Sequence, residues 1–234
     1  MEEMRMSDER ADWILDAAGE LLVSWGYRRV TIEDVARRAG IGKGTVYLHF
    51  NTKEVLFLTV LMRAQARITE RFLAAFEADP SHALPSELSR LVYLWVHEDP
   101  IIHVIMTGDP ETLGTLVRSG ADQLGSLVKA RWRLMADYFA IMREHGVVRD
   151  DLEPGACLYA FASILTGFVS VDAYGADTDV PLEARAEALV HVIRSSFEAP
   201  GAAGRVSAAA PQVAELYRTM RDLLVEEIDR RKLT

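Results

Sequence analysis

Apolar residues recur at helical spacing along almost the whole chain. In the first 25 residues they follow the series i, i+3, i+4, i+7, i+8 and i+11, which is typical of an amphipathic helix. The members of this stripe are Ile14, Ala17, Ala18, Leu21, Leu22 and Trp25. The pattern predicts a helix from about residue 7 or 8 to residue 25, which Gly26 would end.

Two shorter helices are predicted next, separated by a glycine. Thr31 is a good N-cap for the first, because its hydroxyl can accept a hydrogen bond from a free amide of the first turn. Apolar residues then lie on one face up to Ala39, and Gly40 follows where a left-handed residue is needed. The second helix would run from Gly42 or Lys43 to His49. Two such helices in a row indicate a helix-turn-helix, whose second helix enters the DNA major groove.

The rest of the chain also reads as helix, with Pro and Gly at the breaks. A long helix is predicted from Lys53 to about Ala78, followed by a series that ends in an amphipathic helix near the C-terminus. The predicted segments are 85–99, 100–106, 111–118, 121–145, 155–173, 181–197 and 212–232, with 199–211 (APGAAGRVSAAAP) as a small-residue linker. Proline and glycine are the strongest local breaks in such a series.

These elements predict an all-α protein. Residues 1–53 would form a three-helix DNA-binding domain, which the long helix joins to a larger helical domain at 54–198 that dimerises. Residues 199–234 would add the linker and the last helix. The helices at 155–173 and 181–197 carry more apolar surface than one core can use, so we expect a homodimer through them. A two-fold dimer would place two recognition helices one DNA turn apart on a palindrome.

The charge distribution supports a DNA-binding role for the N-terminal segment. Residues 28–53 hold six basic and two acidic residues, a local charge of +4, whereas the whole chain is at −9. A basic patch on an acidic protein is the electrostatic signature of a nucleic-acid face. We expect phosphate contacts from lysines and the tyrosine, base-edge contacts from the short polar side chains, and close backbone approach at the glycine. The candidate DNA-binding residues are Thr31, Lys43, Gly44, Thr45, Tyr47, His49 and Lys53.

Residues 31–56 resemble the DNA-binding domain of TetR-type transcriptional regulators. The general helix-turn-helix spacing runs from Ala36 through Gly40 to Val46, and the run Lys-Gly-Thr-x-Tyr-x-His-Phe followed by Lys53 is specific to this family. The resemblance implies a repressor that leaves a palindromic operator when a small effector binds to the second domain, residues 54–198. The strong likeness covers about the first quarter of the chain, and beyond it the likeness is one of layout.

Candidate effector-binding residues are the aromatic and Met side chains of the second domain, with one histidine. They are Tyr93, Trp95, His103, Met106, Trp132, Met135, Tyr138, Phe161 and Phe168, and Ser163 is a further polar candidate. Any one of them can equally be core, and the group favours an apolar or aromatic small molecule.

Metal and redox chemistry are not indicated. His97, Glu98, Asp99 and His103 lack the spacing of a compact site, and Pro100 intervenes. Cys157 is the single cysteine, so we interpret it as a buried small residue in a reducing compartment. We expect no cofactor and no metal.

Composition is typical of a cytoplasmic protein with a proper core. Half of the residues are hydrophobic, and the first ten, MEEMRMSDER, are mostly charged, so we expect no secretory leader and no membrane span. Two other functions stay open at this point. One is a DNA-binding or architectural protein that has no ligand; the other is a helical enzyme, for which no nucleophile set or phosphate loop is present at motif spacing.

Overall fold

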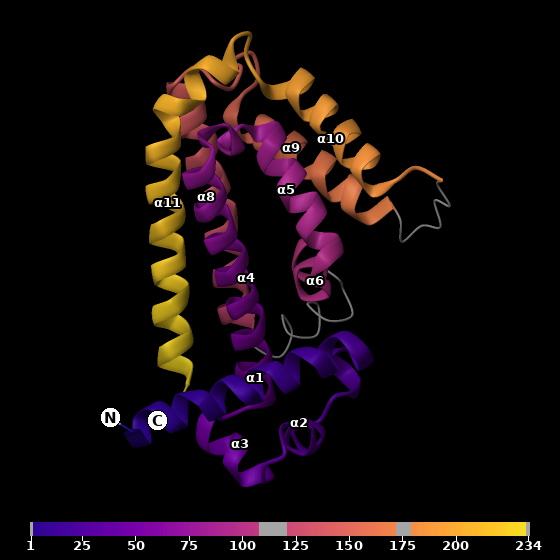
Figure 1. The fold of residues 1–234 in the computed structure, drawn as a ribbon, viewed down its shortest axis with the longest axis vertical. Coiled ribbons are helices and arrows are strands. Elements are labelled where there is room, and N and C mark those ends of the chain that lie inside the picture. Colours follow the sequence, from indigo (N-terminus) through magenta and orange to yellow (C-terminus); the bar gives the residue numbers. More distant parts are fainter. Residues whose placement is uncertain (1, 108–120, 172–178, 233–234) are drawn as a thin grey trace. The chain divides into compact units, whose positions relative to one another are not determined.

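The computed structural model describes residues 2–107, 121–171 and 179–232, and all regular elements in these ranges are helices (Figure 1). One isolated β-bridge, between Val148 and Glu198, is the exception to helical pairing there. The elements are α1 Glu2–Arg29, α2 Ile32–Ala39, α3 Lys43–His49, α4 Lys53–Ala78, the 3-10 turn η1 Pro80–Ala83, α5 Pro85–Glu98, α6 Pro100–Thr107, α8 Ala121–Glu144, α9 Pro154–Ser170, α10 Leu182–Phe197 and α11 Ala202–Arg231. The predicted all-α class is confirmed.

The chain divides into two units. Of the described residues, the first unit comprises 2–67, 121–128 and 222–232, and the second comprises 68–107, 129–171 and 179–221. In the described part of the chain, no helix is long and apolar enough to cross a membrane.

The first unit is built on α1 to α3 and the start of α4. Fully buried apolar residues from all four helices meet in its core: Ile14, Leu15, Val35, Val46, Leu56 and Phe57. Gly26 has φ 74° and ψ 157° inside α1, so the regular helix breaks there, as its sequence predicts. The helix begins earlier than predicted, at Glu2. At the other end of the chain, Lys232 forms an ion pair of 3.0 Å with Asp12, so the C-terminal tail contacts α1 of its own chain.

The second unit has an aromatic core. Phe139, Phe161 and Phe197 come from α8, α9 and α10 and pack edge to face, with ring centroids 4.9 to 6.3 Å apart. Glu198, directly after α10, accepts a hydrogen bond of 2.9 Å from the backbone N–H of Ser86 and so caps the start of α5. Such contacts between distant segments hold the helices in register, because a helix start leaves amide groups without partners.

The prediction of a small-residue linker at 199–211 is wrong. Gly201, at φ 79°, makes the turn, and α11 begins at once with Ala202. Alanine has the highest helix propensity, and Val206 with three neighbouring alanines is buried in the second unit, so this segment has both the tendency and the contacts to be helical. Pro211 lies inside the helix and is exposed. The predicted helix at 111–118 lies outside the described residues.

Candidate nucleic-acid interface

Helix α2 begins with a capping box. The Thr31 hydroxyl accepts a hydrogen bond from the backbone N–H of Asp34, and the Asp34 carboxylate accepts one of 3.0 Å from the backbone N–H of Thr31. These hydrogen bonds from Thr31, followed by the charge of Arg37, lower the pKa of Asp34 below its ordinary value. The polar atoms of Thr31 are therefore engaged in capping the helix, and the predicted N-cap is confirmed.

The turn between α2 and α3 depends on Gly40. Its φ of 71° and ψ of 28° lie in the left-handed region, and the backbone N–H of Ile41 donates to the Ala36 carbonyl at 3.0 Å. Gly42 in extended backbone then starts α3, whose Val46 is fully buried. The two helices are thus braced by one apolar anchor and one left-handed residue, which is the arrangement of a helix-turn-helix.

The outward face of α3 carries most of the predicted DNA-binding residues. Lys43, Gly44 and Tyr47 are exposed, and Thr45 is partly exposed. Two findings differ from the sequence-based expectations. The prediction that His49 faces outward is wrong: its side chain is only 6% exposed, because it lies three residues after Val46 and shares its inward face. Leu48, for which the sequence predicts no role, is 69% exposed.

The positive charge near α3 is partly neutralised by neighbouring carboxylates. Lys43 forms an ion pair with Glu33 of α2, and this pairing raises the pKa of Lys43 and lowers that of Glu33. Arg37 pairs with Asp34, and Arg38 pairs with Glu20 of α1. Solvent screens exposed pairs of this kind, so they contribute little to stability and a phosphate can replace the carboxylate. Three of the six basic residues in segment 28–53 are therefore held in exchangeable pairs.

Lys53 is placed differently from the other predicted phosphate contacts. Its Nζ donates to the Tyr27 carbonyl at 2.6 Å and lies 4.3 Å from the centre of the Tyr27 ring. Burial lowers the pKa of Lys53. The Tyr27 hydroxyl in turn donates to Glu54 at 3.1 Å, and burial raises the pKa of that phenol. In this structure Lys53 joins the start of α4 to the segment just after Gly26.

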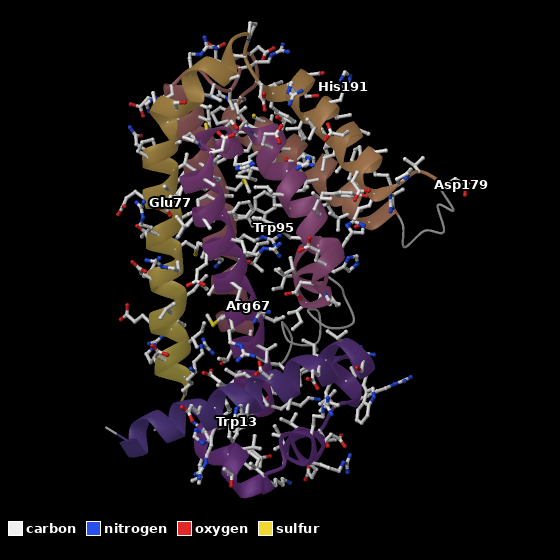
Figure 2. The ribbon with its side chains drawn as sticks, in the orientation of Figure 1. Trp13, Arg67, Glu77, Trp95, Asp179 and His191 are labelled. Atoms are coloured by element: carbon white, nitrogen blue, oxygen red, sulfur yellow. The ribbon has the colours of Figure 1, made fainter. Side chains whose placement is uncertain are left out.

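Several of the predicted effector-binding residues are core residues of the second unit. Tyr93, Tyr138 and Phe161 are at most 1% exposed, and the Tyr138 hydroxyl donates to the Ala83 carbonyl at 2.8 Å. Trp95, labelled in Figure 2, lies against the guanidinium of Arg71 at 4.3 Å and is 7% exposed. Met135 and Phe168 are partly buried and pack against the same core, His103 is partly exposed, and the Met106 side chain lies outside the described residues.

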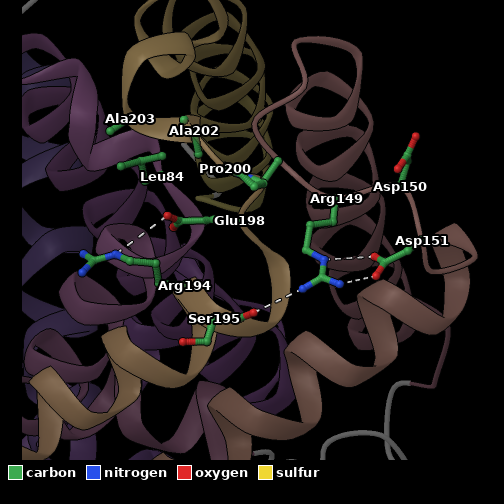
Figure 3. Close-up of a pocket in the computed structure, with 12 residues that line it drawn as sticks. Leu84, Arg149, Asp150, Asp151, Arg194, Ser195, Glu198, Pro200, Ala202 and Ala203 are labelled. Atoms are coloured by element: carbon green, nitrogen blue, oxygen red, sulfur yellow. Dashed lines mark hydrogen bonds and ion pairs between the residues drawn. The ribbon is translucent and has the colours of Figure 1, made fainter.

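Two hollows are present on the second unit. A groove of about 610 Å³ lies between α8 and α9 and is lined by the predicted residues Trp132 and Ser163. A larger one, of about 920 Å³, lies at the end of α10 and contains none of the predicted residues (Figure 3). There Arg149 pairs with Asp151 and also donates to the Ser195 carbonyl. These charged groups satisfy one another, and the sequence gives no spacing signal that would join them.

The polar residues considered for metal binding have other partners. Asp99 accepts hydrogen bonds from the first amides of α6, at Ile101 and Ile102. Glu98 forms an ion pair of 2.7 Å with Arg71, and a ring nitrogen of His97 lies 2.7 Å from the Tyr93 carbonyl. Cys157 is buried, and that burial raises the pKa of its thiol.

Comparison with known proteins matches the N-terminal region first. Residues 14–60 match the family model described as bacterial regulatory proteins, tetR family. The chain is 43% identical over 56 residues to the HTH-type transcriptional activator FasR of Mycolicibacterium smegmatis. This alignment covers 24% of this chain and 26% of FasR. The chain is also 30% identical over 120 residues to the HTH-type transcriptional repressor KstR of Rhodococcus jostii, and this alignment covers 51% of this chain and 56% of KstR.

The similarity to solved structures extends further along the chain. The transcriptional regulator FadR from Bacillus subtilis, solved in complex with stearoyl-CoA, matches with a TM-score of 0.62 over 77% of this chain and 96% of FadR. The sequences are 17% identical, so this likeness is one of fold alone. The first curated relatives are matched over only 26%, 27% and 47% of their own lengths.

Proposed function

Since residues 14–60 place this chain in the TetR family of bacterial regulatory proteins, we propose that it is a cytoplasmic, sequence-specific transcriptional regulator that binds double-stranded operator DNA. The observation that carries the proposal is the outward face of α3. Lys43, Gly44 and Tyr47 are exposed there, while Val46 anchors the helix on its inward side. A helix braced on one face and free on the other is what major-groove binding requires.

Tyr47 gives a direct test of this DNA-binding role. Its ring is 40% exposed, so Tyr47→Ala leaves the core of the first unit intact. An operator is first selected from a random duplex library with the wild-type protein. We expect Tyr47→Ala to reduce affinity for that operator at least tenfold while the circular dichroism spectrum is unchanged. If the folded Tyr47→Ala variant binds the operator with unchanged affinity, the proposed role of α3 in DNA binding is wrong.

The preference of the protein for its operator over random DNA has to be measured at a series of salt concentrations. Phosphate contacts make binding weaken as salt rises, and a specific regulator binds its site about a thousandfold or more tighter than random DNA. Weak and equal binding to all sequences would instead favour the architectural alternative.

We further propose that the protein is a repressor and that residues 54–198 bind a small effector. The effector must bind the form without DNA more tightly, so effector and DNA weaken each other's binding reciprocally. Stearoyl-CoA, the ligand of the FadR structure, is the first probe. We expect it to raise the melting temperature, because a ligand of the native state stabilises that state. A rise together with a loss of operator affinity supports the proposal.

The alternative is a DNA-binding protein whose second domain serves only for dimerisation. The burial of Tyr93, Tyr138 and Phe161 in the core favours it, because these side chains are already occupied in packing. It predicts that no apolar ligand raises the melting temperature and that operator affinity is the same with and without added ligand.

A further inference from the structure

Helical geometry divides α3 into an inward and an outward face. Successive residues are about 100° apart around the axis of a helix. Val46 and His49, the two buried residues of α3, therefore lie within about 60° of each other and define the inward direction. Gly44 lies nearly opposite this direction, with Tyr47 and Leu48 about 50° to either side of the outward direction. Leu48 is thus on the outward face, next to Gly44.

Most of the surface of Leu48 is open to solvent in its own unit. Its side chain is 69% exposed, whereas the other branched aliphatic residue of α3, Val46, is completely buried. The neighbouring residue on the outward face, Gly44, carries no side chain. The space beside it is open, since a Cβ at this position would meet no atom of another element within 4 Å. With no side chain at Gly44 in the way, the isobutyl group of Leu48 can come close to the base edges of DNA.

The major groove offers one apolar group to such a side chain. Each base pair presents hydrogen-bonding atoms there, and thymine alone of the four standard bases adds a C5-methyl group. Leucine can make no hydrogen bond to a base edge, so the feature that it can distinguish is this methyl.

Resting on the proposed function, we infer that Leu48 is a specificity-determining residue that contacts the C5-methyl of a thymine in each operator half-site. Burial of one methyl-sized group corresponds to about 0.8 kcal/mol, or about fourfold in affinity. Lys43 and Tyr47 then supply affinity through phosphates without reading sequence. The contact makes Leu48, and not His49, the side chain of α3 that reads the groove beyond Thr45.

Deoxyuridine tests the contact, because it differs from thymidine only in lacking the C5-methyl. Each thymine of the selected operator is replaced in turn by deoxyuridine, symmetrically in both half-sites, and affinity is measured by fluorescence anisotropy. For the wild type we expect one position at which the replacement lowers affinity, by about fourfold for each half-site. Leu48→Ala is expected to bind the thymine and deoxyuridine operators equally.

Leu223→Ala is the matched control, since Leu223 is also an exposed leucine, at 59%, but lies outside α3. It should discriminate thymine from deoxyuridine as the wild type does. The inference is overturned if Leu48→Ala keeps the full discrimination, or if the wild type responds to no replacement. Failure to select any operator would instead overturn the proposed function, and the inference with it.

Discussion

Gly40 and Gly44 lie four residues apart and are glycines for different reasons. Gly40 has φ 71°, a conformation that costs an L-residue about 1 kcal/mol or more. Gly44 lies inside α3 without a positive φ, and a Cβ there would meet no protein atom within 4 Å. The fold explains the first glycine. For the second, the explanation that we propose is close approach of the α3 backbone to DNA.

The two alanine variants should therefore have opposite effects. We expect Gly40→Ala to lower the free energy of unfolding by about 1 kcal/mol, and Gly44→Ala to raise it by about 0.5 to 1 kcal/mol, because alanine is the better helix former. Gly44→Ala should nevertheless bind the operator at least tenfold more weakly, since its methyl keeps the backbone from the DNA. Urea denaturation and anisotropy titrations measure the two quantities. If Gly44→Ala binds like the wild type, close approach at this position is excluded.

Lys53 gives a second prediction at the residue scale. Its contacts with the Tyr27 carbonyl and ring indicate a positioning role. Lys53→Met should lower the free energy of unfolding by about 1 kcal/mol, the usual contribution of such a hydrogen bond. It should leave the slope of log affinity against log salt unchanged.

Lys43→Ala is the comparison variant for Lys53. Without the Lys43 ammonium the protein neutralises one phosphate fewer and releases fewer counterions on binding, so the slope should become shallower by about one. A shallower slope in Lys53→Met would show that this lysine reaches DNA after all.

The motif in the sequence correctly predicted the helix-turn-helix that carries the candidate interface, but not the orientation of each side chain. His49 belongs to the family pattern and yet is buried, as its spacing of three from Val46 could have indicated. Leu48 was missed because an apolar residue in a short helix is ordinarily assigned to a core. The role of Lys53 depends on a carbonyl 26 residues earlier, a contact that no local pattern contains.

At the scale of elements, local signals predicted α2 well and α11 poorly. The cap at Thr31 and the stop at Gly40 are chemical features of the segment itself. The start of α11 depends on contacts with distant segments, because Val206 and Ala209 are buried against other helices. A run of small residues is compatible with a linker or with a closely packed helix. Which of the two forms depends on whether other helices pack against the run.

If α11 is part of the second core, removing its central aromatic should destabilise that unit. Tyr217 packs against Phe72 and Phe76, with both ring centroids at 5.2 Å. We expect Tyr217→Ala to lower the free energy of unfolding by about 3 kcal/mol, within the range of large-to-small core substitutions. Arg218→Ala, next in the chain but exposed, should change it by less than about 0.5 kcal/mol. Equal effects of the two variants in urea denaturation would contradict the packing role.

For the molecule as a whole, sequence predicted the fold class, but it could not decide which of the candidate effector-binding residues line a cavity and which fill the core. Helices can be recognised from periodicity within one segment, whereas a cavity is the space that several distant segments leave unfilled. Tyr138 illustrates this limit, because an aromatic at helical spacing fits a core or a pocket wall equally well. Its hydroxyl is bonded to Ala83, 55 residues away, and that contact places it in the core.

The predicted homodimer interface is formed by α9 and α10, and the outward face of α9 offers a test of it. That face is uncharged, and Tyr159 on it is 73% exposed. In a two-fold interface the same residue recurs on both copies, so Tyr159→Glu would introduce two like charges into an apolar contact. We expect this variant to sediment as a folded monomer. Leu223→Glu, an equally drastic change at a leucine that is 59% exposed, should remain a dimer.

Dissociation of the dimer should then appear in DNA binding. Two linked heads bind a palindrome far more tightly than one, because the second contact is made at high effective concentration. Tyr159→Glu should therefore keep the affinity of the wild type for an isolated half-site and bind the full operator at least a hundredfold more weakly. A variant that stays dimeric in sedimentation velocity would place the interface elsewhere. A monomer that still binds the full operator with wild-type affinity would show that the two half-sites are read independently.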